Sequence, residues 1–245
     1  MIYAFNLTCH RDWELRTLML ETYTKYSGFS SWSSVNTDVE YPKYHNGAGW
    51  EASMIKMKEL RTILEIYPVK DTDFVLSVDS DVVFTSSEVF KYVVPEYGII
   101  GTRHKPPFNT ALGLWGHMSG ALIFIRGDIA SKIAMLQEPE LNTIRQKHFK
   151  GFDLTENEDV VLSYLCAYVG ANYFDLGSVP DLTSGDFEGD VEHCYYERGE
   201  NDYYLKFNHF KSFYHLNYCP TQFLGEPITG KWDIPKVLKM KRIEL

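Results

Sequence analysis

Short hydrophobic runs alternate with amphipathic helical patterns along most of the chain. Continuous or alternating apolar runs predict strands at residues 2–8, 29–35, 74–78, 99–102, 121–125, 172–175 and 210–216. Apolar residues three or four positions apart predict helices at residues 12–25, 50–67, 128–136 and 157–169. Asp12 is a plausible cap for the first helix, and Pro68 ends the second. This alternation predicts an α/β fold with a mainly parallel central sheet flanked by helices.

The same pattern runs on without an evident domain boundary. No internal repeat, low-complexity tract or linker rich in Gly, Ser or Pro interrupts it. A length of 245 residues also suits one α/β domain. We therefore expect a single domain over residues 1–230, with a solvated polar loop at residues 180–202 and a basic C-terminal tail at residues 231–245.

Composition excludes several classes of protein. The net charge is −9, which makes the chain a poor general binder of nucleic acid, because Lys and Arg supply affinity for phosphates. No apolar run approaches the roughly 20 residues of a membrane-spanning helix. The start of the sequence lacks the features of a signal peptide, so we expect a cytoplasmic location. The four cysteines are far apart and are expected to be reduced thiols: Cys9, Cys166, Cys194 and Cys219.

Asp79-Ser80-Asp81 is the strongest chemical signal, because it follows the apolar run at residues 74–78 directly. Ligands of parallel α/β sheets bind beyond the carboxyl ends of the strands. Two carboxylates so close together repel one another, and a divalent cation relieves that repulsion. Oxygen ligands suit Mg²⁺ or Mn²⁺. The simpler reading is an Asx turn, but the strand before the aspartates favours a metal site.

Three functions are compatible with this motif. In haloacid dehalogenase-type phosphatases Asp79 would be a nucleophile, and residues 79–83 match their DxDx[TV] pattern. That motif normally lies on the first strand, whereas two helices and two strands are expected before Asp79. A carbohydrate-binding module with a structural metal is a second alternative. A metal-dependent glycosyltransferase is the third, and the position of the motif in mid-chain favours it.

Residues 53–85 resemble the GT-A (Rossmann-like) family of xylosyl-, galactosyl- and mannosyltransferases. The family has a helix bearing Lys and Arg, a His-Pro turn, an apolar strand and then Asp-Ser-Asp, with Tyr67 here in place of the His. Residues 119–126 are similar to its Asn-Thr-Gly strand, residues 157–162 to its acidic helix start, and residues 215–220 to its late His segment. The resemblance implies a GT-A fold and a retaining hexosyl- or pentosyltransferase that uses a nucleotide sugar, such as a UDP-sugar, and a carbohydrate, glycoconjugate or other hydroxyl acceptor.

The resemblance also implies a metal site with Mn²⁺ (or Mg²⁺). Asp79 and Asp81 would bind the metal, and His215, which follows an apolar strand, would complete the ligand set. His209 is a rival to His215 for that role.

The remaining candidate residues would contact the donor or the acceptor. Thr8 and Arg11 lie where the family holds uracil and ribose, and Asp79 and Ser80 would also contact the donor. Lys56 and Arg61 lie on the helix before the motif, where basic residues usually form a solvated face, but one of them would reach the diphosphate or the donor sugar. Glu158 and Asp159 would face the acceptor, as a general base in an inverting enzyme or as an orienting group in a retaining one. The helix dipole alone also explains carboxylates at a helix start. Ser119-Gly120 before an apolar strand would line the acceptor cleft, and His117 beside them is a weaker candidate.

Overall fold

The computed structural model describes most of the region predicted to be the α/β domain. The described residues are 1–8, 13–28, 32–36, 49–80, 82–104, 117–149, 158–179, 182, 195–198, 203–206 and 213–215. The strands are β1 (Ile2–Thr8), β2 (Trp32–Asn36), β3 (Phe74–Val78), β4 (Val82–Phe84), β5 (Ile99–His104), β6 (His117–Arg126), β7 (Tyr173–Asp175), β8 (Tyr195–Arg198), β9 (Tyr203–Lys206) and β10 (Phe213–His215). The α-helices are α1 (Trp13–Ser27), α2 (Gly49–Ile66), α3 (Gly127–Met135), α4 (Glu138–Ile144) and α5 (Glu158–Tyr168). Shorter helical turns are η3 (Glu88–Tyr92), η5 (Arg145–Phe149) and η6 (Leu176–Ser178).

A six-stranded sheet forms the centre of the fold, in the order β2-β1-β3-β6-β5-β7. β1 pairs in parallel with β2 and β3, and β5 pairs in parallel with β7. Only β6 runs the other way in this sheet, antiparallel to β3 and β5. The prediction of a mainly parallel sheet flanked by helices is therefore confirmed.

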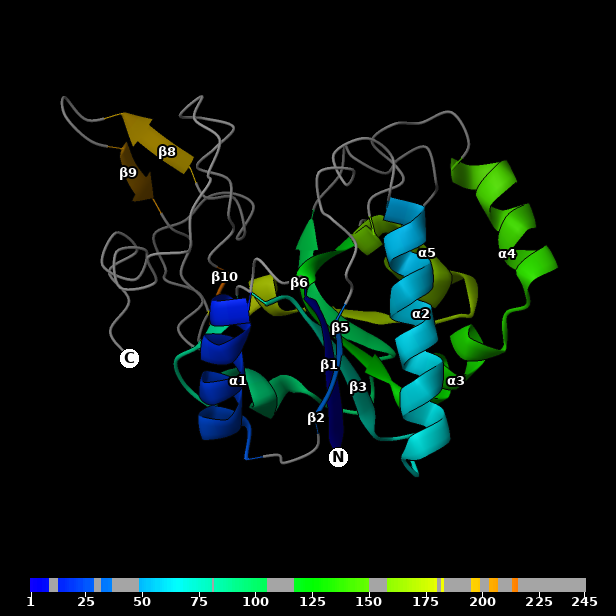
Figure 1. The fold of residues 1–245 in the computed structure, drawn as a ribbon, viewed down its shortest axis with the longest axis horizontal. Coiled ribbons are helices and arrows are strands. Elements are labelled where there is room, and N and C mark those ends of the chain that lie inside the picture. Colours follow the sequence, from blue (N-terminus) through cyan, green and yellow to red (C-terminus); the bar gives the residue numbers. More distant parts are fainter. Residues whose placement is uncertain are drawn as a thin grey trace.

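The strand order creates a topological switch point between β1 and β3. From β1 the chain passes to β2 on one side, and it then returns to place β3 on the other side. In open α/β sheets, ligands bind in the crevice outside the carboxyl ends of the strands at such a point. β1 and β3 both run toward the upper edge of the sheet in Figure 1, so their carboxyl ends meet there.

Helices cover both faces of the sheet, with α1 on one face and α2, α3 and α5 on the other (Figure 1). Successive strand residues point to opposite faces, which divides the core in two. Tyr3 and Phe5 of β1 pack in the cluster that contains α2, whereas Ile2 and Ala4 pack in the cluster that contains α1. The central strands are apolar on both faces because helices cover both faces of the sheet.

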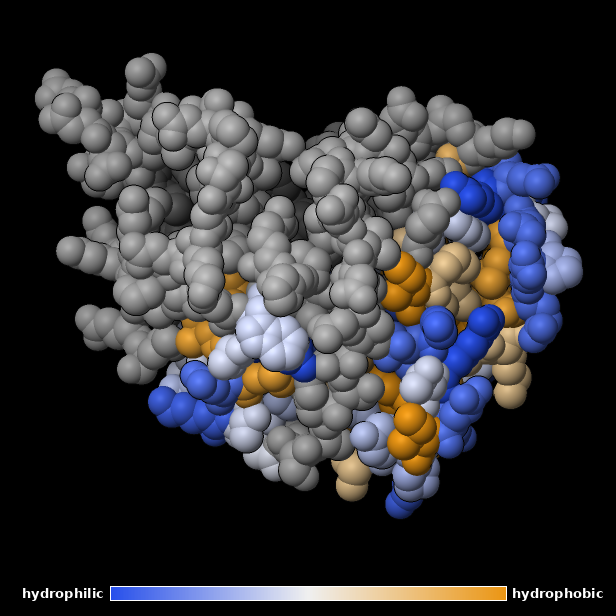
Figure 2. Space-filling view, viewed as in Figure 1, coloured by the Kyte–Doolittle hydropathy of each residue, from blue (hydrophilic) through white to orange (hydrophobic). Residues whose placement is uncertain are grey.

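Helix boundaries follow local signals closely. The helix predicted at residues 50–67 is α2, and its Met57, Leu60 and Ile63 are buried. α1 ends before Gly28, whose φ of 67° is the left-handed conformation that glycine adopts most readily at a helix end. The predicted Asp12 cap lies outside the described residues. Figure 2 shows hydrophilic residues gathered over α4, whose buried Leu141 and Ile144 face the core.

Several elements differ from the sequence predictions. The strand predicted at 29–35 is β2, Trp32–Asn36, and that predicted at 210–216 is β10, Phe213–His215, as far as each is described. β4 and α4 were not predicted, because three and seven residues are too few to show a clear period. The expected loop at 180–202 was wrong in part, since residues 195–198 form β8, which pairs with β9. Aromatic residues in both segments favour such strands.

The structure tests the other sequence predictions only in part. Among the described residues, no helix is long and apolar enough to cross a membrane. Cys166 is a free, buried thiol, and burial raises its pKa, so it is a poor nucleophile. The other three cysteines and the tail at residues 231–245 lie outside the described residues. A single domain over residues 1–230 and a cytoplasmic location therefore stay predictions.

Candidate functional site

Asp79 begins a tight turn at the carboxyl end of β3, where the switch point lies. Its backbone N–H donates to the Ala121 carbonyl of β6 at 2.9 Å, which continues the strand pairing by one residue. Its own carbonyl accepts a hydrogen bond from Val82 N at 3.3 Å, and this bond closes the turn. Alternation along β3 directs Asp79 toward the α2 face of the sheet and Ser80 toward the α1 face. The contacts of both side chains agree with these directions.

Ser80 links the turn to the neighbouring strand. The Asn6 side-chain amide donates to Ser80 Oγ at 2.7 Å, and both residues are buried. Asn6 lies near the carboxyl end of β1, so this bond crosses the switch point. A buried hydrogen bond between residues 74 positions apart holds the aspartate turn in a defined place relative to β1.

Lys56 supplies a positive charge beneath Asp79. It lies in the first half of α2, its side chain is 2% exposed, and its Nζ is 3.6 Å from Asp79 Oδ1. Lysine is almost never buried to this extent without a partner. The Asp79 side chain is 31% exposed, so the carboxylate lies between a buried cation and the surface. The exposed part of the Asp79 carboxylate therefore remains open to a ligand while Lys56 contacts it from the protein interior.

β4 and β10 bring the late histidine segment to the aspartate turn. The two strands are antiparallel, and His215 is paired with Val82, the residue directly after Asp81. β4 is held from the other side by α1, because Phe84 N donates to Thr22 Oγ at 3.2 Å. The backbone of His215 therefore lies beside the strand that follows the Asp79 turn, although 133 positions separate Val82 from His215 in the sequence.

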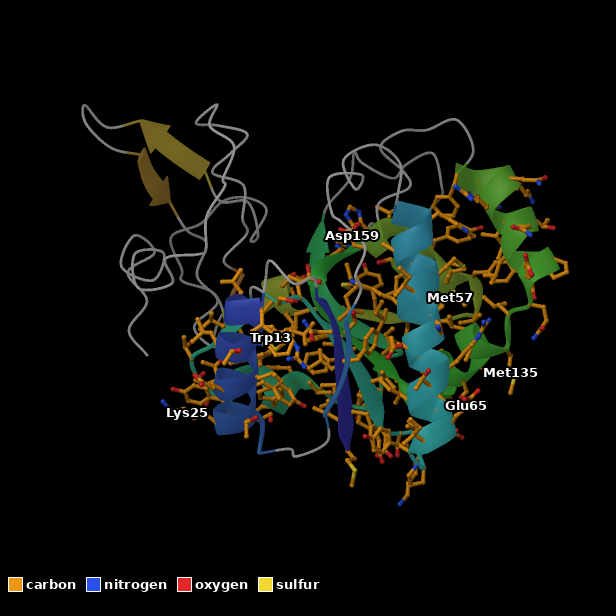
Figure 3. The ribbon with its side chains drawn as sticks, in the orientation of Figure 1. Trp13, Lys25, Met57, Glu65, Met135 and Asp159 are labelled. Carbon is orange, nitrogen blue, oxygen red and sulfur yellow. The ribbon has the colours of Figure 1, made fainter. Side chains whose placement is uncertain are left out.

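A second acid–base pair lies farther along the same edge. His117 Nε2 is 3.5 Å from Asp159 Oδ2, and Asp159 Oδ1 accepts from Val160 N at 2.8 Å. His117 begins β6, and Met118 N donates to Ser163 Oγ at 2.9 Å, which fixes the middle of α5 against the start of this strand. His117 is four residues before Ala121, or about 13 Å along the strand. In Figure 3, Asp159 lies at the same end of the sheet as the start of α2, with Glu65 at the other end.

Arg61 is not brought together with Lys56 and Asp79. It lies about 140° around α2 from Lys56. Its Nε and Nη2 donate to the carbonyls of Ala134 and Leu136 at 2.9 and 2.7 Å. These hydrogen bonds join α2 to the end of α3. This structural role accounts for Arg61 without any contact to a ligand.

The other candidate residues are only partly described. Thr8 ends β1 and Glu158 begins α5, but the side chains of both lie outside the described residues, as does that of Ser119. Nothing is described of Arg11, Asp81 or His209, and of His215 only the backbone. Their proposed roles stay predictions.

Sequence reasoning did not assign roles to two residues that the structure places at the site. Asn6 lies in an apolar strand, and its only signal is that a buried polar residue there requires a partner. Arg103, near the carboxyl end of β5, donates through Nη1 to Tyr173 Oη at 2.7 Å, and its backbone N–H donates to Asp175 Oδ1 at 3.1 Å. No local pattern distinguishes this arginine from a solvated one.

The residues fit a hard divalent cation in their chemistry. Asp79 offers carboxylate oxygens at a strand end, and the strand register pairs the backbone of His215 with Val82, at the start of β4. Carboxylates with one imidazole suit Mn²⁺ well and Mg²⁺ less well. Within the part of the chain that the structure describes, no group of three His, Cys, Asp or Glu side chains is assembled for a metal. Two of the three expected ligand side chains, those of Asp81 and His215, are not among the described ones.

Comparisons with known proteins give similarities of low identity. No protein-family model and no curated protein sequence matches the chain. A glycosyltransferase involved in the glycosylation of the major capsid of PBCV-1 is 12% identical over 71% of this chain and 81% of that one, with a TM-score of 0.41. Mouse xyloside xylosyltransferase 1 is 7% identical over 72% and 85%, with a TM-score of 0.44. The galactosyltransferase LgtC, solved with donor and acceptor sugar analogues, is 10% identical over 67% and 70%, with a TM-score of 0.42. Similarities at this level carry no argument about the function of this chain.

Proposed function

We propose that the protein is a metal-dependent glycosyltransferase of the GT-A fold. It transfers a hexose or pentose from a nucleotide sugar, a UDP-sugar in our proposal, to a hydroxyl of a glycan or glycoconjugate. The observation that carries the proposal is the Asp79 turn, which lies at the switch point of the sheet and has Lys56 buried beneath it. The motif resemblance at residues 53–85 supports the same function from the sequence.

Asp79, Asp81 and His215 are the proposed metal ligands, with Mn²⁺ preferred to Mg²⁺. A bound metal neutralises charge on the diphosphate of the departing nucleotide. Two independent contacts support this assignment: the Asn6 bond to Ser80 fixes the turn, and the pairing of β10 with β4 fixes the backbone of His215. The acidity of the chain is compatible with an anionic donor, because the donor arrives together with a cation.

The remaining proposed roles follow the edge of the sheet. Thr8 and Arg11 would contact the nucleoside at the end of β1. Asp159, together with Glu158, would orient the acceptor at the start of α5. Asp159 Oδ1 accepts a hydrogen bond from Val160 N, and Oδ2 lies 3.5 Å from His117 Nε2, so the carboxylate has a defined orientation at the start of α5. The motif resemblance supports transfer with retention of the anomeric configuration.

Isothermal titration with UDP, with and without Mn²⁺, tests the proposal directly. We expect the wild-type protein to bind UDP only when Mn²⁺ is present, and Asp81→Asn to lose that binding at least 100-fold. Asp71→Asn is the matched control, because Asp71 is an exposed carboxylate at the opposite end of the sheet. It should leave the affinity for UDP unchanged.

Release of UDP from UDP-glucose, UDP-galactose and UDP-xylose identifies the donor in the same preparation. An affinity for UDP that depends neither on Mn²⁺ nor on Asp81 would contradict the proposal. Hydrolysis of a simple phosphomonoester without nucleotide, with Asp79 trapped by beryllofluoride, would instead indicate the phosphatase. Binding of glycans without any affinity for UDP would indicate the carbohydrate-binding module.

A further inference from the structure

Lys56 contacts Asp79 of the aspartate turn and is almost completely buried. Its side chain is 2% exposed, and Ala52, Ser53, Met57 and Leu60 around it on α2 are also buried. A group so far from solvent does not reach a diphosphate in the crevice directly. Its contact with Asp79 is therefore a route by which it affects a ligand.

The Lys56 to Asp79 contact is an ion pair without a short hydrogen bond. At 3.6 Å the distance between Nζ and Oδ1 exceeds the 2.7–2.9 Å of a good charge-assisted bond. Lys56 therefore holds the Asp79 carboxylate mainly through charge, and the carboxylate keeps part of its surface exposed. A metal ion can bind Asp79 while Lys56 stays in place beneath it.

The charges at the turn make the order of binding predictable. Asp79 and Asp81 bring two negative charges, and Lys56 cancels one of them. Of these three charges, a divalent cation arriving alone meets one net negative charge together with the repulsion of Lys56, so Lys56 weakens its binding. Once the cation is bound, the same Lys56 leaves the site with a net positive charge, which attracts an anionic diphosphate.

We propose that Lys56 is a positioning residue that makes loading of the metal depend on the nucleotide. It holds Asp79, weakens the affinity of the site for the free cation and strengthens its affinity for the cation–nucleotide complex. This inference rests on the proposed function, because it assigns a regulation to the same metal site. It differs from the sequence prediction, in which Lys56 contacts the diphosphate itself.

Two titrations on matched variants test the inference: Mn²⁺ alone, and UDP at saturating Mn²⁺. We expect Lys56→Met to bind Mn²⁺ alone about tenfold more tightly than the wild type and to bind UDP about fivefold more weakly, since the cation is removed from both steps. Changes of opposite sign are the signature of a charge effect, because general damage to the site weakens both. Lys58→Met, which removes an exposed lysine from the same helix, should change neither affinity.

Other outcomes separate this inference from the proposed function. If the wild type binds UDP with Mn²⁺ but Lys56→Met changes neither affinity, or weakens both, the inference is wrong and the proposed function stands. If the wild type binds neither probe, both fail. Lys56→Gln provides a second neutral variant should Lys56→Met not fold. In the wild type, UDP must also increase the affinity of the protein for Mn²⁺ at least tenfold. An affinity for Mn²⁺ that is the same with and without UDP overturns the inference without any variant.

Discussion

Both ends of the central sheet carry contacts between an acidic and a basic side chain, but those contacts are built differently. At the end opposite the switch point, Arg126 Nε donates to Asp128 Oδ1 at 2.5 Å and Arg126 Nη2 to Asp128 Oδ2 at 3.0 Å. At the carboxyl end, Lys56 lies 3.6 Å from Asp79, and His117 lies 3.5 Å from Asp159. The first pair is bidentate and short, whereas the other two are longer contacts.

This difference separates charges that serve the fold from charges that can serve a ligand. The Arg126 hydrogen bond and charge lower the pKa of Asp128 below its ordinary value, and Arg126 also donates to the Pro95 carbonyl. A carboxylate held in this way gains little from a further partner. At 3.5–3.6 Å a carboxylate interacts less strongly with its basic neighbour, so a ligand can contact its oxygens at a lower cost in free energy. The following predictions test this contrast.

Asp79→Ala should have the largest effect, because it removes both the ligand group and the carboxylate beside a buried lysine. We expect UDP binding in Mn²⁺ to fall at least 100-fold and the free energy of unfolding to fall by about 2 kcal/mol. Calorimetry and urea denaturation measure the two quantities. Adding Lys56→Met to this variant should recover part of the stability and none of the binding. Recovery of binding would show that Asp79 is not a ligand.

Gly127→Ala should damage the opposite end without affecting the site. A Cβ on Gly127, the first residue of α3, would lie 2.1 Å from the carbonyl oxygen of Lys70. Because that neighbour is backbone, the clash should lower the free energy of unfolding by about 3 kcal/mol. Urea denaturation measures the loss, with Ser131→Ala on the same helix as the control. The affinity of the folded variant for UDP with Mn²⁺ should equal that of the wild type, and a large change would break the contrast between the two ends.

Arg126→Gln should lower stability by about 1.5 kcal/mol at pH 7, through the lost bidentate pair. The pKa of Asp128 is lower in the folded protein than in the unfolded chain, so its contribution is complete above the unfolded pKa. It disappears as the pH falls through the folded pKa. The difference between wild type and variant should therefore shrink below about pH 4. Urea denaturation across pH 3 to 7 measures it, and a difference that grows on acidification would contradict this account.

His117→Ala should have the smallest effect on stability, about 1 kcal/mol or less. Asp159 keeps its bond from Val160 N and its favourable place at the start of α5, where the helix dipole stabilises a carboxylate. Thermal unfolding measures the change, and His117→Gln, which keeps a donor, should recover most of it. A loss larger than that of Arg126→Gln would contradict the contrast between the two ends, in which the His117 contact contributes less to stability than the bidentate pair.

Local patterns in the sequence predicted most elements of the described fold. α2 was predicted at residues 50–67 and is found at Gly49–Ile66, because its buried residues recur at the helical period. The antiparallel direction of β6 could not be predicted, since a buried apolar strand has the same pattern in either direction. β4 was missed because three residues show no period. The strand-end position of Asp79 followed directly from the run of apolar residues before it.

The sequence by itself determined which residues could carry chemistry, since an aspartate pair after an apolar strand is visible without a fold. Only the tertiary structure decided which partners those residues have. It buried Lys56 beneath Asp79, joined Asn6 to Ser80 across the switch point and brought His117 to Asp159. The physical reason is that periodicity reports how each residue is exposed along its own element. Contacts between elements depend on strand order and on crossovers, to which no local pattern refers.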